Sequence, residues 1–514
     1  MGVYAAEIGY HTGSPLPGYP SGVAFFSSGA FVTGGTDTPP HTAFLPRITQ
    51  PALLRRDVFD GGVCGASRVA YGELLLANPD GALDALLSWK IPGYSVTIRY
   101  GEPGTAYPSA WTTVLSGVSS GLTVGWKTLG IKLRDPHQTL DMPLQTVTYA
   151  GTNSGGSGIE GTADDLKGQA KPLLYGRVLN ISPPCVNTSK LIYQVNDGAA
   201  VISAVYDKGI ALTAGTACTS QADMEATVPS AGTYRVWASG GCFRLGSTPA
   251  GTITVDAAQT ASTGDRSAAK LLNAIALKAG VASGSISSSD VTALHTANSA
   301  ELGLWLMTGD TDTAKTAMDA IAVSVGAWYG FDAAGTLRMR QMVAPSGSPV
   351  MELTATNIIG TPELRAIGAA SGGAFYTDVK CSYAKNWTVQ GESDVAGAVT
   401  AARRAWLREE WRMKRPSVVV SDPGYRPELL YEFTGLFLSE SDANTEALRR
   451  YTLLYGRHDT LVVAASASAS VALDLGDVVQ VTLPRFGYDA GVLFVVIGMQ
   501  YDLRRNRIEL TLWR

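Results

Sequence analysis

The chain has 514 residues, of which 45% are hydrophobic, so it is long enough to form several domains with separate cores. Its formal net charge is −4 and only 16% of its residues are charged, which argues against a free nucleic-acid-binding protein with a basic surface. No stretch approaches the roughly 18 consecutive apolar residues that a membrane span requires, and no secretion signal opens the chain.

The cysteines and histidines form no pattern that indicates a metal site or a disulfide framework. Five cysteines are scattered without C-x-x-C spacing, which is typical of small buried side chains: Cys64, Cys185, Cys218, Cys242 and Cys381. The five histidines lie far apart and include no H-x-x-x-H pair. We therefore expect neither a metal nor a cofactor.

Residues 1–150 are predicted to form an N-terminal arm and a first tube-like β-barrel. The first 50 residues are rich in Gly, Pro, Ser and Thr, as at 13–18 and 36–40, and indicate either an arm lying on partners or strands with long loops. Residues 94–100, 122–126 and 129–133 alternate between apolar and polar, as half-buried strands do. Between them, residues 79–87 suggest a short helix capped by Asp80.

A Gly/Ser-rich linker at 151–158 separates this region from a predicted β-rich insertion domain at 159–263. Residues 264–345 change class and predict an α+β domain. Its first helix runs from a cap at Asp265 or Ser267 to Lys278, and a second helix starts after Ser289 or Asp290. A third runs from about Asp312 and carries apolar residues at helical spacing as far as Trp328, and a hairpin follows at 328–337.

Residues 346–514 are predicted to form a second tube-like β-barrel. Alternation at 375–383 and apolar runs at 479–483, 493–499 and 508–512 indicate strands. A helix ending at Gly456 carries Leu448, Tyr451 and Tyr455 on one face. The expected fold is therefore mainly β with an α+β part, as two tube-like β-barrel domains separated by a β insertion and a helical domain.

Motifs for catalysis are missing from the sequence. It contains no G-x-S-x-G, no P-loop and no H-E-x-x-H. The carboxylate pairs Asp164-Asp165 and Glu409-Glu410 are adjacent, so on a strand they point to opposite faces. We predict that the chain is not an enzyme, although a hydrolase that draws carboxylates from distant strands stays open.

The most basic segment, residues 402–415, interleaves arginine with tryptophan. Such a pattern can stack on a single nucleic-acid strand, but Glu409 and Glu410 dilute its charge, and we favour a charged face or a subunit contact. The candidate partner-contact residues are Trp406, Arg408, Trp411, Arg412 and Arg415. Trp237 is a candidate for stacking on a sugar, although a core role is the commoner one for such a residue.

Several segments resemble, in order along the chain, the hub proteins of siphophage tails. They are residues 161–180, 191–195 and 205–213, the L-x-L-G-D-x-V stretch at 473–481, and the final residues 507–513. The sequence is similar to siphophage tail hub or baseplate hub proteins, the family that includes the hub portion of lambda-type tail-tip proteins.

The resemblance implies a structural role in the virion. It implies a homotrimer whose tube-like domains form a pseudo-hexameric ring, bounded by the distal tail protein ring, the tape-measure protein and a central fibre or tip. DNA would pass the lumen only transiently, and the chain would assemble in the host cytoplasm. A receptor- or carbohydrate-binding tail protein and a tail-associated cell-wall hydrolase remain the alternatives.

Overall fold

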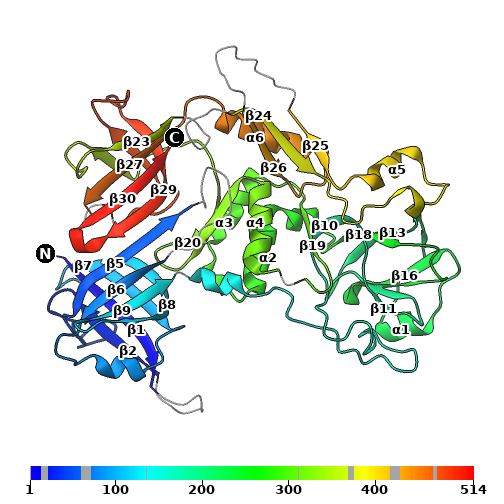
Figure 1. The fold of residues 1–514 in the computed structure, drawn as a ribbon, viewed down its shortest axis with the longest axis horizontal. Helices are drawn as coiled ribbons and strands as arrows, with labels where there is room; N and C mark the ends of the chain where they lie inside the picture. Colours follow the sequence, from blue (N-terminus) through cyan, green and yellow to red (C-terminus); the bar gives the residue numbers. More distant parts are fainter. Residues whose placement is uncertain are drawn as a thin grey trace.

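A computed structural model describes residues 2–12, 21–58, 71–134, 136–310, 312–367, 376–416, 429–466, 470 and 472–514. Cys64 and the Gly/Pro-rich stretch at 13–18 lie outside these residues. The fold is mainly β with an α+β part, as predicted. Figure 1 shows an elongated molecule with a large β lobe that carries both chain ends, a smaller β lobe opposite, and α2, α3 and α4 between them.

The large lobe is built on one 13-stranded sheet that both ends of the chain share. The N-terminal region contributes β1 (Val3–His11), β2 (Ser21–Ser27), β5 (Ile48–Asp57), β6 (Tyr71–Ala77), β7 (Ser95–Gly101), β8 (Thr112–Val124) and β9 (Thr128–Arg134). The C-terminal region contributes β22 (Met351–Thr354), β23 (Glu363–Ile367), β27 (Asp459–Ser466), β28 (Val478–Thr482), β29 (Val492–Asp502) and β30 (Arg507–Trp513). The short strands β3 (Phe31–Val32) and β4 (Ala43–Phe44) pair with each other beside β2.

Strand β29 joins the two regions. Its first residues pair with β28, and its last residues pair with β30 on one side and with β5 on the other, where Met499 lies opposite Arg56. The main path of the sheet runs β2-β1-β7-β8-β9-β6-β5-β29-β30-β27-β23, so among the described strands β2 and β23 are its two edges, and Leu45 bonds to part of the β2 edge. One apolar core continues beneath both regions, from Ile8 and Leu74 to Val463 and Leu510. The two predicted tube-like regions therefore join in a single open sheet.

The extreme N-terminus is not an arm where the structure describes it. β1 lies inside the sheet between β2 and β7, and Ala5, Ala6 and Ile8 are fully buried. This part of the N-terminal region therefore forms strands of the sheet. The short helix predicted at 79–87 is a 3-10 helix, η1 (Asp84–Ser88).

The central α+β part follows the predicted order. It comprises α2 (Ala268–Lys278), α3 (Ser288–Ala297), β19 (Gly303–Leu306), α4 (Ala314–Ser324), β20 (Ala327–Phe331) and β21 (Leu337–Gln341). Ser267 lies at the N-cap of α2, and β20 and β21 form the predicted hairpin. Trp328 belongs to β20 and not to the third helix, because α4 ends before Gly326, which adopts a φ of +60°.

The smaller lobe holds two five-stranded sheets, one of which includes β19. Its elements are β10 (Leu173–Ile181), β11 (Cys185–Asn187), β12 (Ile192–Gln194), β13 (Val201–Asp207), β14 (Ile210–Ala211), β15 (Thr213–Ala214), α1 (Gln221–Ala226), β16 (Thr233–Trp237), β17 (Cys242–Leu245) and β18 (Ile253–Ala258). A three-stranded sheet, β24 (Tyr376–Tyr383), β25 (Arg412–Lys414) and β26 (Leu429–Thr434), packs with α6 (Glu440–Leu454), and α5 (Ala401–Arg408) reaches toward the lobe. Among the helices described, none has the length and hydrophobicity that crossing a bilayer requires.

Candidate functional site

The L-x-L-G-D stretch at 473–477 lies where the large sheet meets the β20–β21 hairpin. Leu473 and Leu475 are buried in the main core. Gly476 adopts a φ of +83°, and a Cβ at this position would lie 2.7 Å from the Cζ2 atom of Trp328. Only glycine allows both this backbone conformation and the approach of the indole ring. The Gly476 N–H donates to the Val496 carbonyl at 2.8 Å, which leads the chain into β28 alongside β29.

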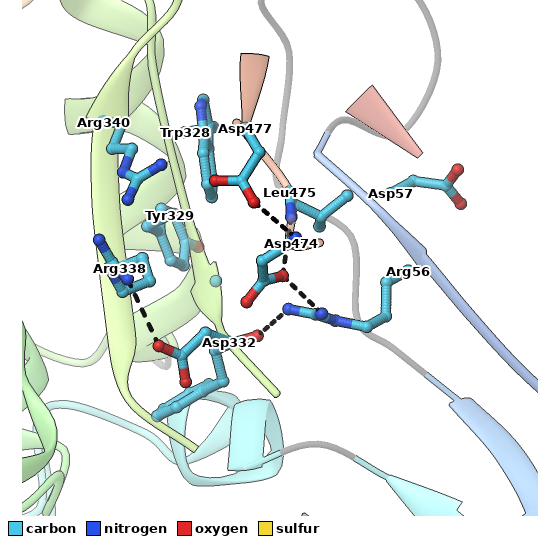
Figure 2. Close-up of a pocket in the computed structure, with 12 residues that line it drawn as sticks. Arg56, Asp57, Trp328, Tyr329, Asp332, Arg338, Arg340, Asp474, Leu475 and Asp477 are labelled. Carbon is cyan, nitrogen blue, oxygen red and sulfur yellow. Dashed lines mark hydrogen bonds and ion pairs between the residues drawn. The ribbon is translucent and has the colours of Figure 1, made fainter. Parts of the chain in front are cut away.

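A buried ion pair fixes this turn against β5. The Arg56 guanidinium lies 2.6 Å from the Asp474 carboxylate and also donates to the Phe331 carbonyl at 2.8 Å. The Arg56 side chain is only 5% exposed. Burial by itself lowers the pKa of Arg56, but Asp474 and Tyr501 outweigh it and hold the pKa above its ordinary value. Figure 2 shows Arg56 reaching from β5 toward Asp474, with Asp332 on the hairpin side.

A second set of charges beside this pair joins the hairpin to α3. Arg338 donates to both carboxylate oxygens of Asp290 at 2.6 and 3.0 Å and lies 3.5 Å from Asp332. Burial raises the pKa of Asp290, but Arg338 and Arg340 hold it below its ordinary value. Asp477 differs, because burial raises its pKa and the charge of Asp474 adds to this effect. The surroundings of Asp477 in the junction therefore disfavour the charged form of its carboxyl group relative to the protonated form.

The junction suits mechanical coupling better than chemistry. It brings together β5, the hairpin and the 473–477 turn, which are each separated by more than 130 residues in the sequence. Its cavity encloses about 40 Å³, which leaves room for water but not for an ordinary substrate. Arg56 pairs with Asp474 on the turn and donates to Phe331 on the hairpin, so a movement of one segment must be transmitted to the other two or break one of these contacts.

The predicted partner-contact residues lie around α5, where several of them make contacts within the chain. Trp406 lies between two arginines, with Arg403 at 4.6 Å and Arg412 at 4.1 Å from its ring centroid. Arg403 also lies 4.5 Å from the Tyr206 ring in the smaller lobe. Arg412 donates to the carbonyls of Ala384 and Trp406. Trp406 and Arg412 therefore help to dock α5 onto the rest of the chain.

The remaining candidates are more exposed, except for the two tryptophans. Arg408 is 51% exposed and pairs with Glu392, and Arg415 is 65% exposed and pairs with Asp378. Trp411 is half-buried against the central core. Trp237 is half-buried and packs against a small core that includes Tyr149 and Met224. These contacts are those of a partly buried core residue, and sugar stacking by Trp237 stays a prediction.

Nucleophile and metal chemistry gain no support from the described residues. Ser267 Oγ lies 2.7 Å from His295 Nδ1, but Ser267 is completely buried and no substrate can reach it. In the parts of the chain that the structure covers, no group of three or more His, Cys, Asp or Glu side chains is placed to hold a metal ion. Cys185, Cys218, Cys242 and Cys381 are free thiols.

Sequence reasoning missed Arg56 as a site residue. The triplet Arg55-Arg56-Asp57 has the composition of an exposed strand end. The available signal was alternation, because Arg56 shares its strand face with Val58, which is 2% exposed. A charged residue on a buried face requires a partner of opposite charge.

Comparison with protein-family models and with curated protein sequences finds no match. Among solved structures, the tail protein from Neisseria meningitidis MC58 is similar over 99% of this chain and 96% of that chain, with 12% identity and a TM-score of 0.41. The 43 kDa prophage tail protein from Shewanella oneidensis is similar over 100% of this chain and 97% of that chain, with 7% identity and a TM-score of 0.42. A chain from the virion of a native gene transfer agent is similar over 73% of this chain and 91% of that chain, with 15% identity and a TM-score of 0.41.

Proposed function

We propose that the chain is the structural hub of a phage tail tip or baseplate. In this role it links the tail tube and the distal tail protein ring to a central fibre or tip, and gates the tube for DNA ejection. The observation that carries the proposal is the large open sheet, to which both ends of the chain contribute. The order of resembling segments along the sequence, including the L-x-L-G-D turn, supports the same role.

The two ends of the sheet favour closure by further copies of the chain. Open strand edges expose N–H and C=O groups that can pair with another chain. On β2, the N–H of Ser27 and the C=O of Phe25 bond to Leu45, on the side away from β1. The backbone N–H and C=O groups of the odd-numbered residues of β2 therefore point away from the sheet. Val23 is next on that edge and is 45% exposed. Pairing of β2 with β23 of a second copy would be heterologous, and such contacts form a ring when the rotation between successive copies closes.

A homotrimer is the proposed closed state, with a lumen that DNA crosses only during ejection. The solution mass of the full chain tests it. We expect about three times the protomer mass of 53.9 kDa. Val23→Pro removes an outward N–H from the β2 edge and is expected to shift the mass toward the monomer, whereas Val23→Ala keeps this N–H and serves as the matched control. A stable monomer of the unaltered chain would contradict the proposal.

A further inference from the structure

A groove lies beside β19, between α4 and the segments that flank β24 and β25. It encloses about 370 Å³, which is the size of a small ligand or a few side chains. Leu304, Leu306, Ala317, Ala320 and Trp387 contribute apolar surface, and Asp310, Asp312, Lys385 and Glu410 contribute charge. The groove is distinct from the junction at Arg56, with which it shares no residue.

The charges of the groove are not balanced. The Lys385 ammonium lies 3.9 Å from Glu410 and 4.0 Å from the Trp387 ring centroid, so this cation already has partners. Asp310 accepts a hydrogen bond from the Met307 N–H at 2.7 Å. Burial, and then the charge of Asp310, raise the pKa of Asp312. Among the residues that line the groove, none supplies a cation to the two aspartates, so the groove favours a positively charged ligand.

The edge of β19 adds a backbone site. β19 pairs with β10, and the Arg177 N–H donates to the Leu302 carbonyl, whereas the Gly303 N–H donates to Leu436 on the opposite side. Because strand residues alternate in direction, the N–H and C=O of Trp305 point the same way as those of Gly303. Within the described part of the chain, neither group has a backbone partner. An extended peptide can pair with this edge, as in β-strand addition.

We propose that this groove binds an extended segment of a partner protein that carries a lysine or arginine between apolar residues. The charged group of this lysine or arginine lies against Asp310 and Asp312, and the aliphatic part of its side chain covers the apolar floor. The backbone of the bound segment pairs with Trp305. Charge complementarity selects this occupant over a neutral sugar or an acidic peptide. The inference concerns peptide binding and does not depend on the proposed tail role, so failure of one would not contradict the other.

Methyl NMR of the full chain tests this directly, with methionine methyl groups labelled with ¹³C. Met307 lines the groove and is 47% exposed, and its signal is identified by Met307→Leu. The probe is the peptide acetyl-Ala-Leu-Arg-Leu-Ala-amide, and the control peptide has citrulline, which is neutral, in place of arginine. We expect saturable movement of the Met307 methyl signal with the arginine peptide and binding weaker by about tenfold or more with citrulline.

Substitution of the two groove aspartates tests whether they bind the arginine of the peptide. Asp310→Asn combined with Asp312→Asn is expected to weaken binding of the arginine peptide by about tenfold or more. Asp164→Asn is the matched control, because it removes one exposed carboxylate outside the groove and should leave binding unchanged. An unmoved Met307 signal, an equal response to citrulline, or full binding by the double variant would each overturn the proposal. If the double variant fails to fold, the comparison of the two peptides on the unaltered chain still decides.

Discussion

Removal of one partner from the Arg56–Asp474 pair is expected to loosen the joint between the two regions of the large sheet. A fully buried pair that loses one partner destabilises a protein by about 3–5 kcal/mol, because the remaining charge is buried alone. The two variants should differ. Asp474→Asn leaves the guanidinium, which is 5% exposed, and we expect about 3 kcal/mol. Arg56→Met leaves a carboxylate that is 27% exposed, and we expect about 1–2 kcal/mol.

Hydrogen exchange of the β5 and β29 amides is the suitable assay, because the several cores of the chain need not unfold in one step. A loss of about 3 kcal/mol accelerates exchange at this joint by about a hundredfold when exchange follows local opening. The double variant Arg56→Met/Asp474→Asn should exchange more slowly than Asp474→Asn alone, since no charge remains buried. Asp80→Asn, in the more exposed pair with Arg47, is the control and should cost less than about 1 kcal/mol. Additive effects of the two junction variants would refute the reasoning.

Three further predictions concern the junction and α5. Gly476→Ala should lower the melting temperature by more than Val23→Ala, because its Cβ meets Trp328 and its backbone has a positive φ. Asp477→Asn should stabilise the protein at pH 7: burial raises the pKa of Asp477 above 3.8, so its carboxyl favours folding when protonated and loses this contribution as the pH rises through the folded-state pKa. Melting curves should show the gain shrinking as the pH falls through the folded-state pKa toward 3.8 and absent below it, and a gain that stays constant with pH would contradict this explanation. Trp406→Ala should increase proteolysis around α5, whereas the exposed Trp126→Ala should not.

Local patterns predicted many of the elements. Alternation at 94–100 corresponds to β7, and the turn residues between Trp328 and Leu337 correspond to the β20–β21 hairpin. The α6 face was predicted incompletely. Leu448 is 36% exposed. The buried face of α6 instead carries Glu446 and Arg450, whose carboxylate and guanidinium groups form an ion pair at 2.7 Å. Periodicity of apolar residues cannot identify a buried pair of opposite charges, because each residue alone has the composition of a solvent-facing position.

Non-local pairing accounts for the rest of what the sequence could not predict. The β5–β29 joint connects residues more than 400 positions apart, and neither strand carries a local signal for its partner. The groove is similar, since β19, α4 and the segment around Lys385 meet only in the folded chain. The composition of the basic segment predicts contacts with a partner, and the structure shows that Arg412 and Trp406 make contacts within the same chain.

The claim that the sheet closes by edge pairing between copies is tested most directly by disulfide cross-linking. Val23 on β2 and Arg365 on β23 are exposed and lie at opposite ends of the sheet, as Figure 1 shows for the two strands. We expect the variant Val23→Cys/Arg365→Cys to give a covalent trimer after oxidation, while each single variant does not. A double variant that stays monomeric and uncross-linked would contradict the proposed ring.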